Sequence, residues 1–260
     1  MTQQSDAALG QFQPLDGHPV LVNGPTAGKS VTKPPNSPET VVSAIGVRKS
    51  YSIGGENQRV LDDVDFHANA GENVFLSGPS GSGKSTLLSI LGCLLDCDGG
   101  EISIAGHRVD QLNSAERTLV RKNEIGFVFQ RFQLIQALTA EDNVALPLTL
   151  KGHSLHDSRQ RASVLLARVG LKSHRHHLPG KMSPGQCQRV ALARAIITEP
   201  KLILADEPTA ALDGKSGMEV MELLQELVAN SNAATVVVTH DPRILHYADR
   251  VCEIENGRFK

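Results

Sequence analysis

Apolar positions follow two different periods along most of the chain, and their order predicts the fold. Short alternating or continuous apolar segments predict strands, and apolar positions at helical spacing predict helices. Strands are expected at residues 41–49, 60–68, 72–77, 101–105, 125–129, 201–205 and 234–239, with a closing hairpin at 250–260. Helices are expected at residues 85–91, 113–122, 141–150, 157–169, 184–197 and 215–229. This alternation predicts an α/β fold with a parallel core sheet that binds ligands at the carboxyl ends of its strands.

Two parts of the pattern depart from the β/α alternation. The first two strands are joined by Gly54-Gly55, which predicts an antiparallel N-terminal β subdomain. The helices at 141–150 and 157–169 have no strand between them, so we expect an α-helical subdomain at about residues 131–198. The second of these helices is predicted to place Val164, Leu165 and Val169 on one face.

Residues 1–40 have a different composition from the rest of the chain. Proline, glutamine, serine, threonine and glycine dominate there, with little apolar periodicity. Such a segment buries too little apolar surface to offset the entropy of ordering, so we expect a disordered tail followed by one domain at 41–260. The tail contains Gly24-Pro25-Thr26-Ala27-Gly28-Lys29-Ser30, whose glycines are one residue too close for a phosphate-binding loop.

Deleting residues 1–40 is therefore expected to leave the thermal midpoint and any catalytic rate of the domain unchanged. Differential scanning calorimetry of the two chains measures the first, and a turnover assay the second. A clear drop in either quantity would mean that the segment packs on the domain.

Composition excludes several classes of protein. The net charge of −2 lacks the excess of positive charge that is typical of nucleic-acid-binding proteins. The apolar runs are too short to span a bilayer, and no basic segment followed by an apolar stretch suggests a signal peptide. Cys93, Cys97, Cys187 and Cys252 form no paired motif, so reduced thiols in a cytoplasmic protein are expected.

The segment 78–86 carries the clearest chemistry. It consists of Gly78, Pro79, Ser80, Gly81, Ser82, Gly83, Lys84, Ser85 and Thr86, which match the phosphate-loop pattern G-x-x-x-x-G-K-[ST]. Glycines let backbone N–H groups converge on phosphate, Lys84 neutralises phosphate charge, and Ser85 offers a hydroxyl to Mg²⁺. A strand before the loop and a helix after it complete the expected context, and the helix N-terminus favours anions. Chance produces the pattern in such a chain on the order of 1% of the time.

Polar residues follow three of the predicted core strands, at the edge where the phosphate loop is expected. They are Gln130, Asp206-Glu207 and His240. Together with Lys84 they suit phosphoryl transfer to water: Asp206 would hold Mg²⁺, and Glu207, pointing the other way because strand side chains alternate, would orient the water.

Other polar residues have ordinary structural interpretations. Ser183 and Gln186 form a helix capping box with Pro184 at the first helical position. The ring of Tyr51 could stack on a nucleotide base, or it could be an ordinary half-buried aromatic at the end of a strand. The imidazoles of His174, His176 and His177 fit a solvated loop better than a metal site.

The order of these motifs resembles the ATP-binding cassette (ABC) ATPases over residues 41–260. Segment 78–86 resembles the Walker A loop, 202–207 the Walker B strand, Gln130 the Q-loop, 209–213 the D-loop and His240 the switch histidine. Residues 182–186, Met-Ser-Pro-Gly-Gln, followed by Gln-Arg-Val-Ala at 188–191, resemble the signature motif, usually written LSGGQ. The segment departs from the family at Met182, Pro184 and Cys187. The segments 126–130 and 143–148 are similar to the lipoprotein-release and macrolide-export branch.

The resemblance implies roles for individual residues. Tyr51 would stack on adenine, and Ser183, Gly185 and Gln186 would meet the ATP held by an opposite subunit, with Asp213 nearby. It implies Lys84, Gln130, Glu207 and His240 as catalytic residues, and Ser85, Gln130 and Asp206 as Mg²⁺ ligands.

The resemblance also implies an assembly. Its members form dimers that enclose two ATP molecules, and Gln130 would face an integral membrane permease at the cytoplasmic side of the inner membrane. We therefore expect an ATPase subunit that drives a separately encoded membrane permease of the exporter or lipid-extraction type, with no nucleic-acid partner. An ATP-driven signalling subunit that does not transport is the alternative. A soluble ABC ATPase of DNA repair or translation usually carries a coiled coil, a zinc insert or a second cassette, which this sequence lacks.

Overall fold

The computed structural model describes residues 39–54, 56–229 and 231–260. The predicted tail at 1–40 lies outside them except for its last two residues. Thr40 belongs to the first strand, where it pairs with Asn69.

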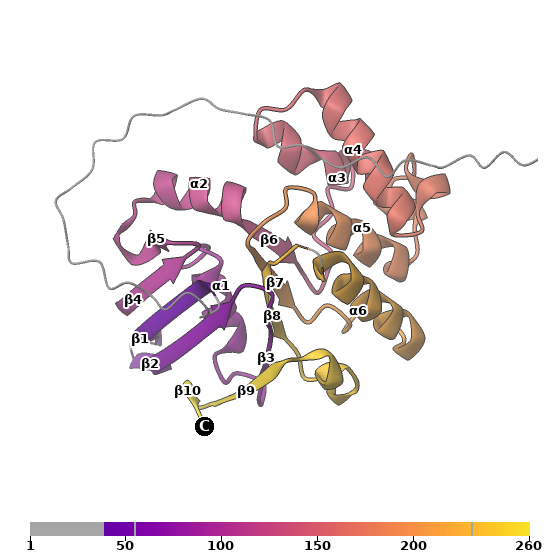
Figure 1. Ribbon diagram of the computed structural model, residues 1–260. Helices are drawn as coiled ribbons and strands as arrows, with labels where there is room; N and C mark the ends of the chain where they lie inside the picture. Colours follow the sequence, from indigo (N-terminus) through magenta and orange to yellow (C-terminus); the bar gives the residue numbers. More distant parts are fainter. Residues whose placement is uncertain (1–38, 55, 230) are drawn as a thin grey trace, which may run out of the picture. The chain divides into compact units, whose positions relative to one another are not determined.

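An antiparallel sheet forms the N-terminal part of the domain (Figure 1). Its strands lie in the order β2-β1-β4-β5, with bounds β1 Thr40–Ile53, β2 Glu56–Asn69, β4 Gly99–Ile104 and β5 His107–Arg108. The predicted pairing of the first two strands is confirmed, and each is longer than the apolar pattern indicates because the ladder continues to Ile53 and Glu56 beside the turn.

A second sheet has the strand order β10-β9-β3-β8-β7-β6. Its bounds are β3 Asn73–Ser77, β6 Ile125–Val128, β7 Leu202–Asp206, β8 Ala234–Val238, β9 Arg250–Glu255 and β10 Arg258–Phe259. Strands β6, β7, β8, β3 and β9 are parallel, and β10 pairs antiparallel with β9. The predicted parallel core and closing hairpin are confirmed, and the first strand of that hairpin extends the parallel sheet.

Within the described residues, six α-helices lie between these strands. They are α1 Lys84–Leu91, α2 Ser114–Glu124, α3 Ala140–Leu150, α4 Leu155–Arg168, α5 Pro184–Ile196 and α6 Gly214–Val228. Short 3₁₀ turns occupy Val109–Gln111, Lys172–His174, Pro179–Lys181 and Pro242–Tyr247. Helices α2 to α6 each begin after a side chain that accepts hydrogen bonds from the first turn, provided by Asn113, Thr139, Ser154, Ser183 and Asp213.

The two helices without a strand between them are α3 and α4, as predicted, but the predicted face of α4 is wrong in part. Val164 is 63% exposed, whereas Ser158, Ala162 and Leu166 are buried. Residues four positions apart lie on one side of a helix, and this row packs toward the rest of the domain. The division of the chain at about 131–198 stays a prediction.

Strand β3 lies between two hydrophobic cores because successive side chains point to opposite faces of a sheet. Phe75 belongs to the core shared with α3, α4, α5 and α6, while Val74 and Leu76 belong to the core shared with α1 and the antiparallel sheet. Both faces of the parallel sheet are thus covered, which explains its nearly continuous apolar strands. The four cysteines are free. In the described part of the chain no helix is both long and apolar enough to cross a bilayer.

Candidate functional site

The loop between β3 and α1 has a backbone that glycine alone adopts easily. Gly78, Gly81 and Gly83 have φ angles of 139°, 77° and 104°. A Cβ on Gly78 would lie 2.1 Å from the carbonyl oxygen of Ile254, and one on Gly83 would lie 2.8 Å from that of Val60. The loop is therefore pressed against β9 and β2, which hold its N–H groups in a compact turn at the start of α1.

Lys84, the first residue of α1, is folded back over this loop. Its side chain is buried, and its Nζ donates to the carbonyl oxygens of Gly78 at 2.8 Å and Pro79 at 2.7 Å. A cation inside a ring of backbone groups next to a helix N-terminus is suited to binding an anion such as phosphate.

Ser85 and Asp206 meet directly behind the loop. The hydroxyl of Ser85 donates to Oδ1 of Asp206, the last residue of β7, at 3.2 Å. Burial raises the pKa of Asp206, and the neighbouring Glu207 carboxylate raises it further, against the lowering effects of Ser85 and Lys84. A hydroxyl and a carboxylate held together are ligands that suit Mg²⁺. This donor pair fits the predicted metal site, while the third predicted ligand, Gln130, remains a prediction.

Replacing Asp206 by Asn is expected to raise the thermal midpoint of the nucleotide-free protein. A raised pKa in the folded state means that the fold disfavours the charged form, so removing the charge relieves a cost that is present at neutral pH. A gain of about 1 kcal/mol would raise the midpoint by about 2–4 °C. Calorimetry at pH 7 and at lower pH measures it, and the gain should shrink as the pH falls, because the raised pKa makes the parent aspartate bind a proton more readily than an ordinary aspartate. A lower midpoint at pH 7 would contradict the prediction.

Glu207 and His240 form the second close pair of the site. The Oε1 of Glu207 and the Nδ1 of His240 are 2.7 Å apart, with exposed side-chain fractions of 15% and 69%. Glu207 has a φ of 49°, in the left-handed region. The expected cause of its orientation, strand alternation, is therefore wrong, because β7 ends at Asp206 and a turn directs Glu207 toward His240.

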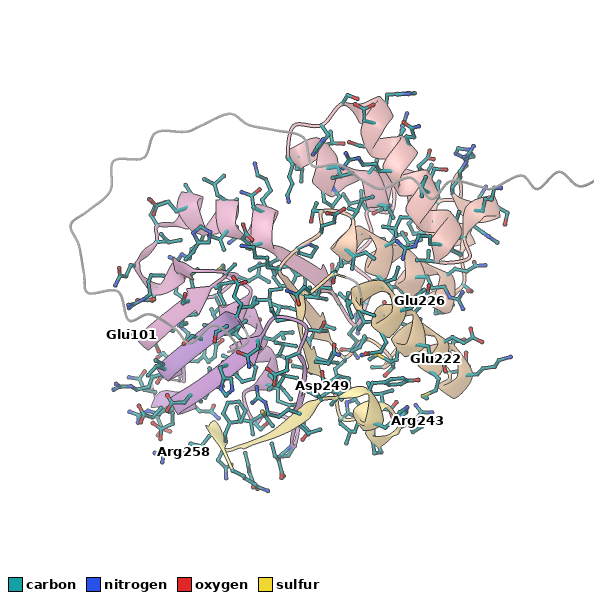
Figure 2. The ribbon with its side chains drawn as sticks, viewed as in Figure 1. Glu101, Glu222, Glu226, Arg243, Asp249 and Arg258 are labelled. Carbon is teal, nitrogen blue, oxygen red and sulfur yellow. The ribbon has the colours of Figure 1, made fainter. Side chains whose placement is uncertain are left out.

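A cavity of about 260 Å³ adjoins this pair. Glu207, Thr209, His240 and Arg243 contribute to its walls. Figure 2 shows Arg243 on the turn after β8, where its guanidinium pairs with Asp241 at 2.8 Å. The carboxylate thus borders open space large enough for water next to an imidazole, the arrangement needed to orient and deprotonate a water molecule.

Gln130 and Tyr51 keep their predicted roles as predictions. Val128 pairs with Ala205 in the sheet, so Gln130 follows β6 at the same level at which Glu207 follows β7. Tyr51 is 37% exposed on β1, with Nζ of Lys49 5.7 Å from its ring centre.

The predicted capping box at the start of α5 is confirmed. The Oγ of Ser183 accepts from the N–H of Gln186 at 3.3 Å, and Oε1 of Gln186 accepts from the N–H of Ser183 at 2.9 Å. The Nε2 of Gln186 also lies 3.2 Å from Nε2 of His174. Pro184 occupies the first helical position, where an N–H has no partner within the helix.

Asp213, which is predicted to lie near nucleotide, caps the N-terminus of α6. It accepts from the N–H groups of Lys215 and Ser216 at 3.1 and 3.0 Å, and from the hydroxyl of Ser216 at 2.7 Å. These bonds from Ser216 hold the pKa of Asp213 below its ordinary value. A Cβ on Gly185 would lie 3.6 Å from Cβ of Ser216, so the starts of α5 and α6 are adjacent.

Replacing Pro184 by Gly is expected to change the ATP hydrolysis rate of the assembled protein by less than about tenfold, or roughly 1.4 kcal/mol in barrier. Proline at this position removes no helical hydrogen bond, and Ser183 and Gly185 are unaltered. Gly185→Pro should cost much more because it removes a backbone donor from the helix start. The steady-state rate of ATP hydrolysis is measured for both variants. A hundredfold higher rate for Pro184→Gly would show that Pro184 slows hydrolysis in the parent.

The C-terminal hairpin supports the loop, a contribution that the sequence pattern does not reveal. The N–H of Gly257 donates to the Ser82 carbonyl at 3.2 Å, and the Gly257 carbonyl accepts from the N–H of Asp62 at 2.9 Å. Arg258, labelled on β10 in Figure 2, also donates through Nε to Asp62 at 3.0 Å. Gly257 predicts only a turn, because contacts with Ser82 and Asp62 depend on tertiary packing.

Comparison with known proteins agrees with this geometry. Residues 61–210 match the ABC transporter family. The chain is 46% identical over 214 residues to the macrolide export ATP-binding/permease protein MacB of Photorhabdus laumondii, covering 82% of this chain and 33% of that protein. It is 43% identical over 219 residues to the lipoprotein-releasing system ATP-binding protein LolD of Shewanella oneidensis, covering 84% of this chain and 95% of that one. The chain thus spans about a third of the MacB relatives and almost the whole of LolD.

Two solved structures share the fold. They are the dimeric MJ0796, a bacterial ABC transporter cassette, and the same cassette in a post-hydrolysis state bound to ADP and Pi. Each has a TM-score of 0.79 and 41% identity, covering 84% of this chain and 96% of the other. The α/β fold with an antiparallel β part and a parallel core is therefore that of an ABC cassette.

Proposed function

Because this chain belongs to the ABC transporter family, we propose that it is an ATP-hydrolysing subunit that drives a separately encoded membrane permease. The observation that carries the proposal is the pair of contacts behind the phosphate loop, Ser85 with Asp206 and Glu207 with His240. One pair suits the metal that accompanies ATP, and the other suits the water that attacks it.

Each residue then has a distinct task in hydrolysis. The loop and Lys84 bind the β- and γ-phosphates once Nζ exchanges the Gly78 and Pro79 carbonyls for phosphate oxygens. Ser85 and Asp206 would hold Mg²⁺, which neutralises charge that develops on the phosphates. Glu207 accepts a proton from water, and His240 keeps the carboxylate oriented through the 2.7 Å contact.

The proposed working unit is a dimer that encloses two ATP molecules. The dimeric cassettes of similar fold support this, as does the exposed capping box at Ser183 and Gln186. Backbone N–H groups at the start of α5 would meet the γ-phosphate of ATP held by the partner. The permease would lie in the membrane, with this subunit at its cytoplasmic face.

The names of the relatives support export or extraction from the membrane as the process that is driven. One is a macrolide exporter, and the other releases lipoproteins. LolD is an ATP-binding protein of nearly the same length as the matched region, which supports a permease encoded on a different chain.

The test combines hydrolysis with identification of the partner. Phosphate release from ATP by the purified chain, with and without Mg²⁺, measures activity, and Lys84→Ala serves as the inactive variant. Purification of the tagged chain from membranes then identifies the permease, whose transport is assayed in vesicles. Absence of Mg²⁺-dependent hydrolysis would refute the enzymatic part, and hydrolysis without transport would favour a signalling subunit.

A further inference from the structure

One polar side chain deep in the domain connects α5 with the turn that carries Glu207. Gln188 is fully buried, and its Nε2 donates to the carbonyl oxygen of Pro208 at 2.8 Å. Because a carbonyl only accepts, the amide must direct its NH₂ group toward Pro208. Its other end, Oε1, has no hydrogen-bond partner in the described structure.

This arrangement contributes little to stability. A buried acceptor without a partner has lost its hydrogen bonds to water, and this cost offsets the gain from the bond to Pro208. A methionine of similar volume would bury the same space without a desolvated acceptor. A fold that keeps Gln188 here therefore points to a role for the bond other than stability.

The bond acts on a strained turn. Pro208 directly follows Glu207, whose φ of 49° is unfavourable for a side chain with a Cβ. Two backbone hydrogen bonds hold the turn: the N–H of Glu207 donates to the carbonyl of Val238 in β8 at 2.9 Å, and the N–H of Ala210 donates to the Glu207 carbonyl at 3.2 Å. Gln188 adds a third hydrogen bond to this turn, from α5 to the Pro208 carbonyl. The position of α5 is thus linked to the residue that follows Glu207.

The same helix begins at the capping box. Gln188 lies four residues after Pro184, about 6 Å along the helix axis at 1.5 Å per residue. Helix α5 is also attached to α6 by an ion pair between Arg189 and Glu219 at 2.7 Å. Little more than one helical turn therefore separates the start of α5 from the side chain that binds the Pro208 carbonyl.

We infer that Gln188 is a positioning residue that connects the signature segment at the start of α5 to the orientation of Glu207 in the same chain. The inference rests on the proposed ATPase function and adds a regulation to it. When the start of α5 binds the nucleotide of the opposite subunit, the bond to Pro208 keeps Glu207 directed at its own attacking water. Hydrolysis at one site would thereby depend on the signature contact that the same chain makes at the other.

The first experiment replaces Gln188 by Met in the full-length chain. The rate constant kcat for ATP is expected to fall at least about tenfold, because a small misplacement of a catalytic group has effects of this size or larger. KM for ATP and the thermal midpoint should stay close to the parent values. Thr235→Val is the matched control, since Thr235 is also fully buried with an unpartnered oxygen but lies in β8. It should leave kcat unchanged.

The second experiment places Gln188→Met in the Glu207→Gln background and measures ATP-dependent dimers by size-exclusion chromatography. Dimers should form as in Glu207→Gln alone, because the start of α5 is intact. Loss of these dimers would overturn the inference, since Gln188 would then only support the signature segment. Parent-like kcat for Gln188→Met would also overturn it. An inactive parent chain would instead refute the proposed function, on which this inference depends.

Discussion

Replacing Glu207 by Gln is expected to lower the ATP hydrolysis rate by about 100- to 10,000-fold, the range typical of losing a general base. The amide has the shape of the carboxylate but does not accept the proton of the attacking water. Because the turn at φ 49° and the loop around Lys84 are unchanged, ATP should bind as it does to the parent.

The bound but unhydrolysed ATP should trap a closed dimer. Size-exclusion chromatography with ATP and Mg²⁺ measures the dimer, and phosphate release measures the rate. Glu226→Gln is the matched control, since it makes the same chemical change on the exposed side of α6, where Figure 2 labels Glu226. Hydrolysis by Glu207→Gln at the parent rate would remove this residue from the mechanism.

Replacing Gly78 by Ala is expected to lower the free energy of unfolding by about 2–5 kcal/mol, the sum of a steric overlap and an unfavourable φ. The new Cβ would lie 2.1 Å from the carbonyl oxygen of Ile254, and the φ of 139° is one that side chains with a Cβ rarely adopt. Relief requires β9 to separate from the end of β3, where Ser77 pairs with Glu253.

The matched control for this prediction is Gly81→Ala. Gly81 has a φ of 77° but no atom within 4 Å of the added Cβ, so only a conformational cost of about 1–2 kcal/mol is expected. Chemical denaturation without nucleotide measures both variants, and titration with a fluorescent ATP analogue measures binding, which Gly78→Ala should lose. Equal destabilisation by the two substitutions would show that contact with β9 is unimportant.

The parts of the site that follow from local rules could be predicted from the sequence. Phosphate binding requires glycines and a lysine at fixed spacing within a few residues, so Gly78 to Thr86 carry their own signal. The capping box of Ser183 and Gln186 is local in the same sense, and its hydrogen bonds occur as predicted. The short apolar runs around Leu202 and Ala234 likewise determine buried parallel strands, because both faces of such a strand are covered.

Contacts between distant segments were decided by the tertiary structure. The predicted row on α4 is wrong at Val164 because helical periodicity does not say which side of a partly polar helix meets a neighbour. The closing hairpin is predictable from Asn256-Gly257. Its first strand pairs with β3 and presses on Gly78 only because the chain returns there from 176 residues away, the separation of Ser77 and Glu253.

The geometry around Glu207 shows the same division most clearly. The sequence alone determines that an acidic pair follows a buried strand and that His240 follows another, which places three groups at one sheet edge. The left-handed turn at Glu207, its 2.7 Å approach to His240 and the bond from Gln188 to Pro208 arise only when β7, β8 and α5 pack together. Backbone strain of this kind has no local signature, because glutamate alone does not favour a positive φ and distant partners must hold it there.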